Sequence, residues 1–466
     1  MSSAIPPLDL SWLLMETPAG TTHVGAMLLF KKPPGRRGLV REVVDAYRAQ
    51  QPQPPFNFVP ELIGGGAPHF REVDAWDPYY HVQHLALPAG SSYQELLRLV
   101  ADLHEPMLDR DRPLFRCWVI DGVPGGRFAI YTKTHHSIID GVSGLKRLYD
   151  GLGVTDEPAI LAPAFAQPRP PAPPRPPTPA LRRVTDLVRG ALAQVGALNQ
   201  ISLTALRKGI SAAFGSHLEG SLPFVARHAP TNIPLKQARG FATLSLPLEE
   251  MHHIGHQFGA TLNDVAATVI DHGLHAYLRE KGQGWGEELI AMVPLSLRGE
   301  GDSAVGTRVS AMFVRLGAPD ADVVARLRQV VHSVATAKTE LGALSPDGAM
   351  TYAVAIIAVA GAGATTHLDR VGHPACNLVI SNVPGAKQTR YLNGAELVGI
   401  FPVSALAAAI GLNVTLSSYR DHMDFGFVTN AAALDDVHGL AEHTRQAYAE
   451  LKAAAGKPLP RRGVHA

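Results

Sequence analysis

A proline-rich segment about one third of the way along the chain divides this sequence of 466 residues into two parts. Residues 167–179 read QPRPPAPPRPPTP and contain eight prolines. Because proline lacks an amide N–H and fixes φ, this segment can join neither a helix nor a β-ladder, and we expect an extended surface linker. The sequence therefore predicts an N-terminal domain over residues 1–160, a linker with crossover helices over 161–235, and a C-terminal domain over 236–458.

Hydrophobic periodicity predicts strands and helices in both parts. Apolar residues three or four apart indicate helices, and short runs of branched and aromatic residues bounded by turns indicate strands. Hairpins and crossovers are mixed in both parts, so we expect α/β units with mixed sheets. The expected strands cover residues 22–30, 114–120, 128–133, 240–247, 288–297, 308–316 and 377–383, with three more between 395 and 429. The expected helices cover residues 8–15, 38–50, 91–104, 180–218, 248–258, 260–278 and 322–341.

Composition excludes several classes of protein. Lys and Arg number 42 and Asp and Glu number 41, so the net charge of +1 gives no indication of a surface that binds nucleic acid. Cys117 and Cys376 are the only cysteines, which excludes a disulfide framework and favours a reducing compartment. The first residues lack a basic segment followed by an apolar run, so we expect no signal peptide and a cytoplasmic protein.

One apolar segment requires a decision between a membrane span and a buried helix. Residues 349–368 contain no Asp, Glu, Lys or Arg, and twenty such residues could cross a bilayer as a helix. The segment is rich in Ala, Gly and Thr and includes His367, which favours a buried helix or the wall of an apolar channel.

Two adjacent histidines, His135 and His136, stand between an expected strand and an expected short helix. They belong to Thr-His-His-Ser-Ile-Ile-Asp-Gly, residues 134–141. A turn between a strand and a helix holds a side chain in position and leaves it accessible. Histidine, with a pKa of about 6.5, can take a proton from an alcohol and return it near neutral pH. The motif therefore predicts acid/base chemistry.

A structural interpretation of the same turn stays open at this point. Asp140 could be an N-cap for the following helix, and Gly141 could relieve a tight turn. If the strand continues through the histidines, His135 and His136 point to opposite faces, and one of them is buried and hydrogen-bonded.

Two further groups of polar residues have competing interpretations. His252 and His256 lie four apart on an expected helix, a spacing that can bind zinc, but no third ligand is evident and a solvated helix face is favoured. Asn263 and Asp264 open another expected helix and could be a cap. Alternatively, the Asn263 amide could donate to an oxyanion formed at an acyl carbonyl. The sequence contains no G-x-S-x-G elbow, so a histidine base without a serine nucleophile indicates direct transfer.

Several motifs together resemble the bacterial wax ester synthase/acyl-CoA:diacylglycerol acyltransferase family. The resemblance covers nearly the whole chain, and the combination of HHxxxDG with S-N-V-P-G makes it specific. The matching segments are LDLSWLLMETP at 8–18, HVG at 23–25, HHxxxDG at 135–141, NDV at 263–265, VPLSLR at 293–298, NLVISNVPG at 377–385, and GLNVT at 411–415 with Ser418 and Tyr419.

This resemblance implies a chloramphenicol-acetyltransferase-like fold of two related domains with an active-site tunnel between them. It implies that His136 is the general base and that His135 and Gly141 shape the turn. Asp140 would hold the turn through an arginine, for which we expect Arg298.

The resemblance also implies further site residues. Asn263 would be the oxyanion donor. The substrate-binding residues would be Ser381, Asn382, Pro384 and Gly385.

The resemblance implies a reaction without metal and without a permanently bound cofactor. Acyl-CoA would be the co-substrate and diacylglycerol or a long-chain alcohol the acceptor, giving triacylglycerol or wax ester. The protein would associate peripherally with the inner face of the membrane or with lipid inclusions.

The sequence departs from the family pattern at two places, and two other functions stay open. The family's Pro-Leu-Trp is Pro113-Leu114-Phe115 here, and an expected Gly-Asn pair is Gly306-Thr307. The alternatives are another CoA- or carrier-dependent, condensation-type acyltransferase, and a catalytically silent protein that binds lipid or coats lipid droplets.

Overall fold

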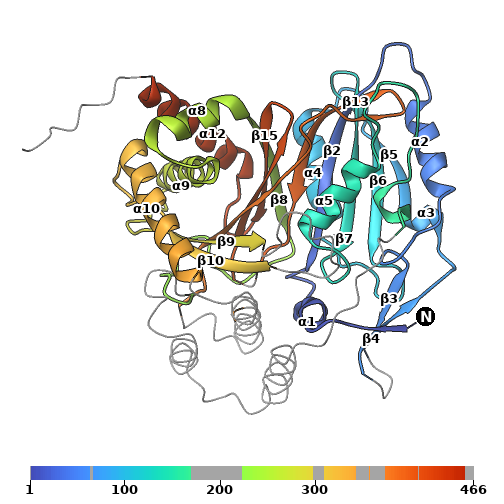
Figure 1. The fold of residues 1–466 in the computed structure, drawn as a ribbon, viewed down its shortest axis with the longest axis horizontal. Helices are drawn as coiled ribbons and strands as arrows, with labels where there is room; N and C mark the ends of the chain where they lie inside the picture. Colours follow the sequence, from blue (N-terminus) through green and yellow to red (C-terminus); the bar gives the residue numbers. More distant parts are fainter. Residues whose placement is uncertain are drawn as a thin grey trace, which may run out of the picture.

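The chain forms two bodies side by side, each built on a six-stranded mixed sheet (Figure 1). The computed structural model describes residues 2–62, 67–168, 223–296, 309–342, 356, 373–407 and 409–456. Most of the proline-rich segment, the expected helix at 180–218, Arg298, Gly306-Thr307 and all of 349–368 except Ile356 lie outside these residues.

The first sheet combines five strands that are antiparallel to their neighbours with one parallel edge pair, β5 with β6. Its central strands β2 and β7 pair along their whole length, from His23 opposite His135 to Lys31 opposite Arg127. The strands expected at 114–120 and 128–133 are β6 and β7, which pair antiparallel as a hairpin. In order the strands are β12 (Tyr391–Leu392), β13 (Ala395–Val403), β2 (His23–Lys31), β7 (Arg127–His135), β6 (Phe115–Val123) and β5 (Val82–Ala86).

The second sheet has a parallel centre, where β11 pairs with β9 and β14, and antiparallel edges. Both sheets are therefore mixed, as expected. In order the strands are β10 (Val309–Arg315), β9 (Ile290–Ser296), β11 (Leu378–Val383), β14 (Leu412–Tyr419), β15 (His422–Asn430) and β8 (Arg239–Pro247).

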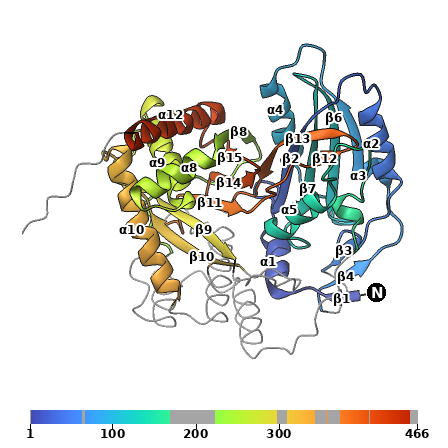
Figure 2. The same ribbon diagram turned by 45° about the horizontal axis from the view of Figure 1, so that its top comes forward.

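Two strands from the second half of the chain, β12 and β13, complete the first sheet. β13 pairs antiparallel with β2, and Figures 1 and 2 both show it in orange within the N-terminal body. Where β13 crosses β15, a Cβ on Gly426 would lie 1.8 Å from the carbonyl oxygen of Pro402, so this approach requires glycine. Sheet membership therefore does not follow chain order, and the two sheets are interlocked.

Helices cover the sheets in the way that their apolar spacing predicts. In the N-terminal body, α2 (Leu39–Arg48) and α5 (Gly141–Asp150) cover one face, and α4 (Tyr93–His104) lies between the other face and β8. Ser92 and Glu95 form a capping box at the start of α4.

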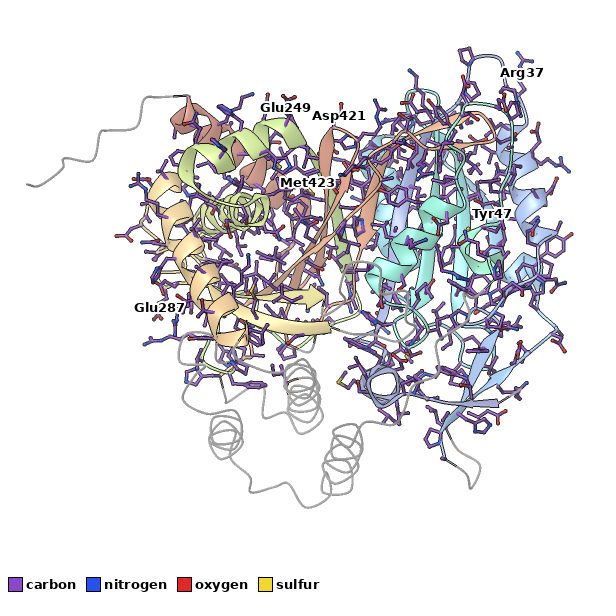
Figure 3. All side chains as sticks on the ribbon, viewed as in Figure 1. Arg37, Tyr47, Glu249, Glu287, Asp421 and Met423 are labelled. Carbon is purple, nitrogen blue, oxygen red and sulfur yellow. The ribbon has the colours of Figure 1, made fainter. Side chains whose placement is uncertain are left out.

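Among the residues that the structure describes, four helices pack around the second sheet, and Met423 of β15 is buried in the core that they share (Figure 3). They are α8 (Leu248–Phe258), α9 (Leu262–Glu280), α10 (Val323–Gly342) and α12 (Val437–Ala455).

A small sheet and one helix close the lower end of the N-terminal body in Figure 1. Helix α1 (Pro7–Met15) lies here, beside the sheet of β1 (Ser2–Ala4), β4 (His69–Glu72) and β3 (Phe58–Glu61). Within the described part of the chain, no helix is long and apolar enough to cross a membrane.

Candidate active site

A cavity of about 900 Å³ lies between the two bodies. In Figure 2, α5 of the first body and β11 of the second face each other at this junction. Most side chains of the wall are apolar. Representative wall residues are Trp12 on α1, Val24 on β2, Leu145 on α5, Ala267 on α9, Met292 on β9, Met312 on β10 and Ile380 on β11.

The motif of two histidines forms the turn between β7 and α5, at the edge of this cavity. Asp140 is the N-cap of α5, because its Oδ1 accepts from the Ser143 amide at 2.7 Å. The capping interpretation of Asp140 is therefore confirmed. Asp140 and Gly141 also line the cavity, and a Cβ on Gly141 would lie 3.8 Å from Val383 of β11.

His136 stands in the cavity wall and is held from two sides. Its amide donates to the Thr22 carbonyl at 3.0 Å. Its ring stacks on Trp12, with centroids 4.4 Å apart and an interplanar angle of 20°. Nδ1 is buried, so Nε2 is the nitrogen left to face the cavity. Burial lowers the pKa of His136 below its usual value, opposed by the charge of Asp140, so the ring is neutral at pH 7.

His135 points to the opposite face of β7 and is fully buried. Its Nδ1 accepts from the Ser137 amide at 3.1 Å and lies 2.7 Å from Ser137 Oγ. Because an amide always donates, Nδ1 carries no proton, and Nε2 donates toward Thr22 Oγ1 at 3.1 Å. His135 does not line the cavity. It holds the turn from which His136 projects.

Glu16 lies behind His135 as a buried carboxylate that the motif analysis did not identify. One oxygen accepts from the Thr22 amide at 3.2 Å, and the other lies 3.1 Å from Arg110 Nη2 and 3.4 Å from His135 Nε2. Burial alone would raise the pKa of Glu16, but its interactions with His135, Thr22 and Arg110 lower it. The only sequence signal was its place in the segment at 8–18.

Asn263 and Asp264 have separate roles at the start of α9. Asp264 forms a capping box with Thr261, so capping does not require Asn263. Asn263 is exposed toward the cavity, and its Oδ1 accepts from Asn382 Nδ2 at 2.7 Å. With the amide oxygen engaged, the NH₂ group of Asn263 is the part that can donate to a substrate.

The expected substrate-binding residues divide into two groups. Ser381, Asn382 and Pro384 line the cavity, at the end of β11. Gly385 does not. A Cβ on Gly385 would lie 1.9 Å from the Ser418 carbonyl oxygen, so this glycine permits close packing instead of facing a substrate.

The described ranges contain no group of three or more His, Cys, Asp or Glu residues that could hold a metal ion. His252 and His256 lie on the exposed face of α8. Cys117 and Cys376 are buried, and burial raises the pKa of each thiol to about 12. Neither cysteine is therefore a thiolate nucleophile near neutral pH.

Two family models match the sequence. The wax ester synthase/diacylglycerol acyltransferase catalytic domain matches residues 5–266, and the WS/DGAT C-terminal domain matches residues 305–452. Among curated relatives, the probable diacylglycerol O-acyltransferase Tgs4 of Mycobacterium tuberculosis is 33% identical over 466 residues, or 98% of each chain. The O-acyltransferase WSD of Acinetobacter baylyi is 29% identical over 446 residues, covering 94% of this chain and 95% of the relative.

Solved structures give the same result. The wax ester synthase/diacylglycerol acyltransferase of Marinobacter aquaeolei VT8 matches with a TM-score of 0.78 at 26% identity, over 98% of this chain and all of its own. A starter condensation domain of rhizomide synthetase matches with a TM-score of 0.53 at 15% identity, covering 98% of this chain and 95% of the domain. The expected fold, two chloramphenicol-acetyltransferase-like units with mixed sheets, is confirmed.

Proposed function

The chain belongs to the wax ester synthase/diacylglycerol acyltransferase family, and from this membership we propose that it moves a long-chain fatty acyl group from acyl-CoA to diacylglycerol, to a long-chain alcohol, or to both. Membership makes the chain an acyltransferase. The donor, the acceptor and the residues that carry the reaction are the proposed part.

In the proposed reaction His136 acts as general base. Its neutral Nε2 takes the proton from the acceptor hydroxyl, and the oxygen attacks the thioester carbonyl. The C–S bond of the tetrahedral intermediate then breaks, and the imidazolium returns the proton to the departing CoA sulfur. No acyl-enzyme forms, which agrees with the buried, protonated state of both cysteines.

The remaining site residues support this step without forming covalent bonds. The NH₂ group of Asn263 would donate to the developing oxyanion, and Asn382 would hold the Asn263 amide in that orientation. Asp140 would hold the turn as N-cap and keep a negative charge near the imidazolium that forms on His136. His135 and Gly141 would shape the turn. Ser381 and Pro384 would contact substrate, and Gly385 would place them.

The observation that carries the proposal is the position of His136, a neutral imidazole in the wall of a mainly apolar cavity between two bodies. Such a cavity suits fatty chains, which gain about 0.8 kcal/mol for each methylene removed from water. A base placed among apolar groups also acts on a hydroxyl without competition from bulk water.

His136→Ala tests the proposal. CoA release from palmitoyl-CoA, with dioleoylglycerol or hexadecanol as acceptor, should fall at least about 100-fold, the lower end of what a positioned base contributes. His252→Ala, on the exposed face of α8, is the matched control and should keep wild-type turnover. Unchanged turnover in a folded His136→Ala protein would end the assignment. Lipid binding without CoA release in the wild type would instead indicate a silent lipid-binding protein.

The location of the protein is also part of the proposal. Substrates that partition into lipid favour a cytoplasmic protein held at the inner face of the membrane or at lipid inclusions. Fractionation of cells that express the chain, with washes at high salt, would test this location.

A further inference from the structure

One end of the main cavity is closed by a wall that it shares with a second, smaller cavity. The second cavity measures about 30 Å³ and lies between the first sheet and residues 163–165. The same five residues line both cavities, so a single layer of side chains separates them. These residues are Cys117, Thr132, Leu148, Ala164 and Phe165.

Phe165 has the largest side chain of this wall and is held between other rings. Its ring is buried and stacks on Phe115, with centroids 5.0 Å apart and an interplanar angle of 22°. Tyr47 of α2, labelled in Figure 3, meets it edge-on at 6.2 Å. Contacts with two fixed aromatic neighbours hold the ring in one position across the end of the cavity.

The backbone that carries Phe165 is anchored independently of its ring. Phe165 is the middle residue of a short 3₁₀ turn, η1 (Ala164–Ala166). Its carbonyl accepts from the Gln53 amide at 2.8 Å, and the Ala164 carbonyl accepts from Arg147 Nε at 3.1 Å. Shortening the Phe165 side chain should therefore open the wall while the backbone stays in place.

We propose that Phe165 is a specificity-determining residue, the stop that sets the length of the fatty chain which this end of the cavity accepts. The proposal rests on the proposed function, because it requires that a fatty chain enters from the His136 side. Each methylene that fits improves binding about fourfold, and one that meets the ring must displace packed aromatic side chains. The accepted length therefore ends where the Phe165 ring begins.

The two substrates both carry fatty chains, so the test needs two series. In one series the acyl-CoA varies from lauroyl through palmitoyl to arachidoyl with a fixed acceptor. In the other the acceptor chain varies over the same lengths with palmitoyl-CoA fixed. Phe165→Ala frees space on the order of 100 Å³ and joins it to the small cavity, which gives room for roughly three or four methylenes.

The expected result is a change in one series only. The ratio of kcat/KM for the longest chain to that for palmitoyl, or for hexadecanol in the acceptor series, should rise at least about tenfold in Phe165→Ala. Phe165→Leu removes less volume and should shift the same ratio by a smaller factor. It also provides the test should Phe165→Ala fail to fold. The series that responds identifies which chain lies against Phe165.

Leu152→Ala is the matched control. Leu152 is buried and lines the small cavity but not the main one, so its truncation enlarges the small cavity without opening the wall. Its chain-length profile should match the wild type. An unchanged profile in both Phe165 variants, or an equal change in both series, would overturn the proposal. A wild type that releases no CoA would instead overturn the proposed function itself, so the two failures are distinguishable.

Discussion

Replacing Glu16 by glutamine tests whether a residue that does not line the cavity positions His136, the proposed general base. The Glu16 side chain has no exposed surface, and the substitution keeps its shape while it removes the charge that accepts from Arg110 and His135. A hydrogen bond to a charged acceptor contributes about 1.5–3 kcal/mol. The Arg110 side chain is 31% exposed, so solvent screening weakens its hydrogen bond to Glu16. We therefore expect the substitution to lower the free energy of unfolding by about 3 kcal/mol.

The same substitution should change kcat and leave KM nearly unchanged. Without the carboxylate, the His135 ring loses the negative charge that lies 3.4 Å from its Nε2, while its Nδ1 still accepts from the Ser137 amide, so the turn that carries His136 loosens. We expect kcat to fall about 10- to 100-fold, which corresponds to about 1.4–2.7 kcal/mol of transition-state stabilisation. Glu16 does not line the cavity, so substrate affinity should hold.

The assay combines urea unfolding with steady-state CoA release at several palmitoyl-CoA concentrations. Glu250→Gln is the matched control, since Glu250 accepts from Tyr448 at 2.6 Å and Lys452 at 2.8 Å but lies on α8, far from the turn in sequence and 40% exposed. Its kcat should equal that of the wild type. If folded Glu16→Gln keeps kcat within about twofold of the wild type, the positioning role of Glu16 is wrong.

Two further predictions concern the site and the fold. Because burial lowers the pKa of His136, kcat/KM should stay constant from about pH 8 down to about pH 7 and should fall about tenfold per pH unit only once the pH drops below that lowered pKa. Asp140→Asn should move this acid limb to lower pH, since the Asp140 charge raises that pKa; a limb above pH 7 would contradict the assignment. Gly426→Ala should lower the unfolding free energy by at least about 3 kcal/mol in urea titration, since its Cβ would lie 1.8 Å from the Pro402 oxygen. Gly286→Ala has no atom within 4 Å of the new Cβ and should stay within about 0.5 kcal/mol of the wild type.

Local patterns in the sequence predicted most individual elements because their causes are local. Helix α8 begins at Leu248 and ends at Phe258, as the apolar spacing indicates, and Gly259 closes it with a φ of 66°. The capping box of Ser92 and Glu95 is likewise local, since it joins residues three apart in the sequence. The C-terminal helix α12 (Val437–Ala455) and the strands β3, β4 and β5 were not predicted. The three strands have only four or five residues each, which is too short for a clear alternation of apolar and polar residues.

Contacts between distant segments lay beyond sequence reasoning. β13 pairs with β2, which lies about 370 positions earlier in the sequence. No local pattern indicates which of the two sheets β13 joins. The same limit applies to Glu16, which lies 119 residues before His135. Its buried partners could be found only from coordinates. The role expected for Arg298 as partner of Asp140 stays a prediction, since Arg298 lies outside the described residues.

The alternation of side chains along one strand explains how this site combines a fixed base with an apolar cavity. Polar groups that fix the turn must be buried with their partners, because an unpaired buried polar group costs about 1–3 kcal/mol. Neighbouring residues at the end of β7 meet this requirement on opposite faces. His135 enters the network of Glu16 and Thr22, while His136 faces the cavity with few polar neighbours. The crossing of β13 and β15 then holds the second body against the first, so that Asn263 of one body and His136 of the other line the same cavity. If the polar groups that hold the turn lay on the cavity side, they would occupy the space that a fatty chain needs. For this reason two adjacent histidines serve the proposed reaction better than one.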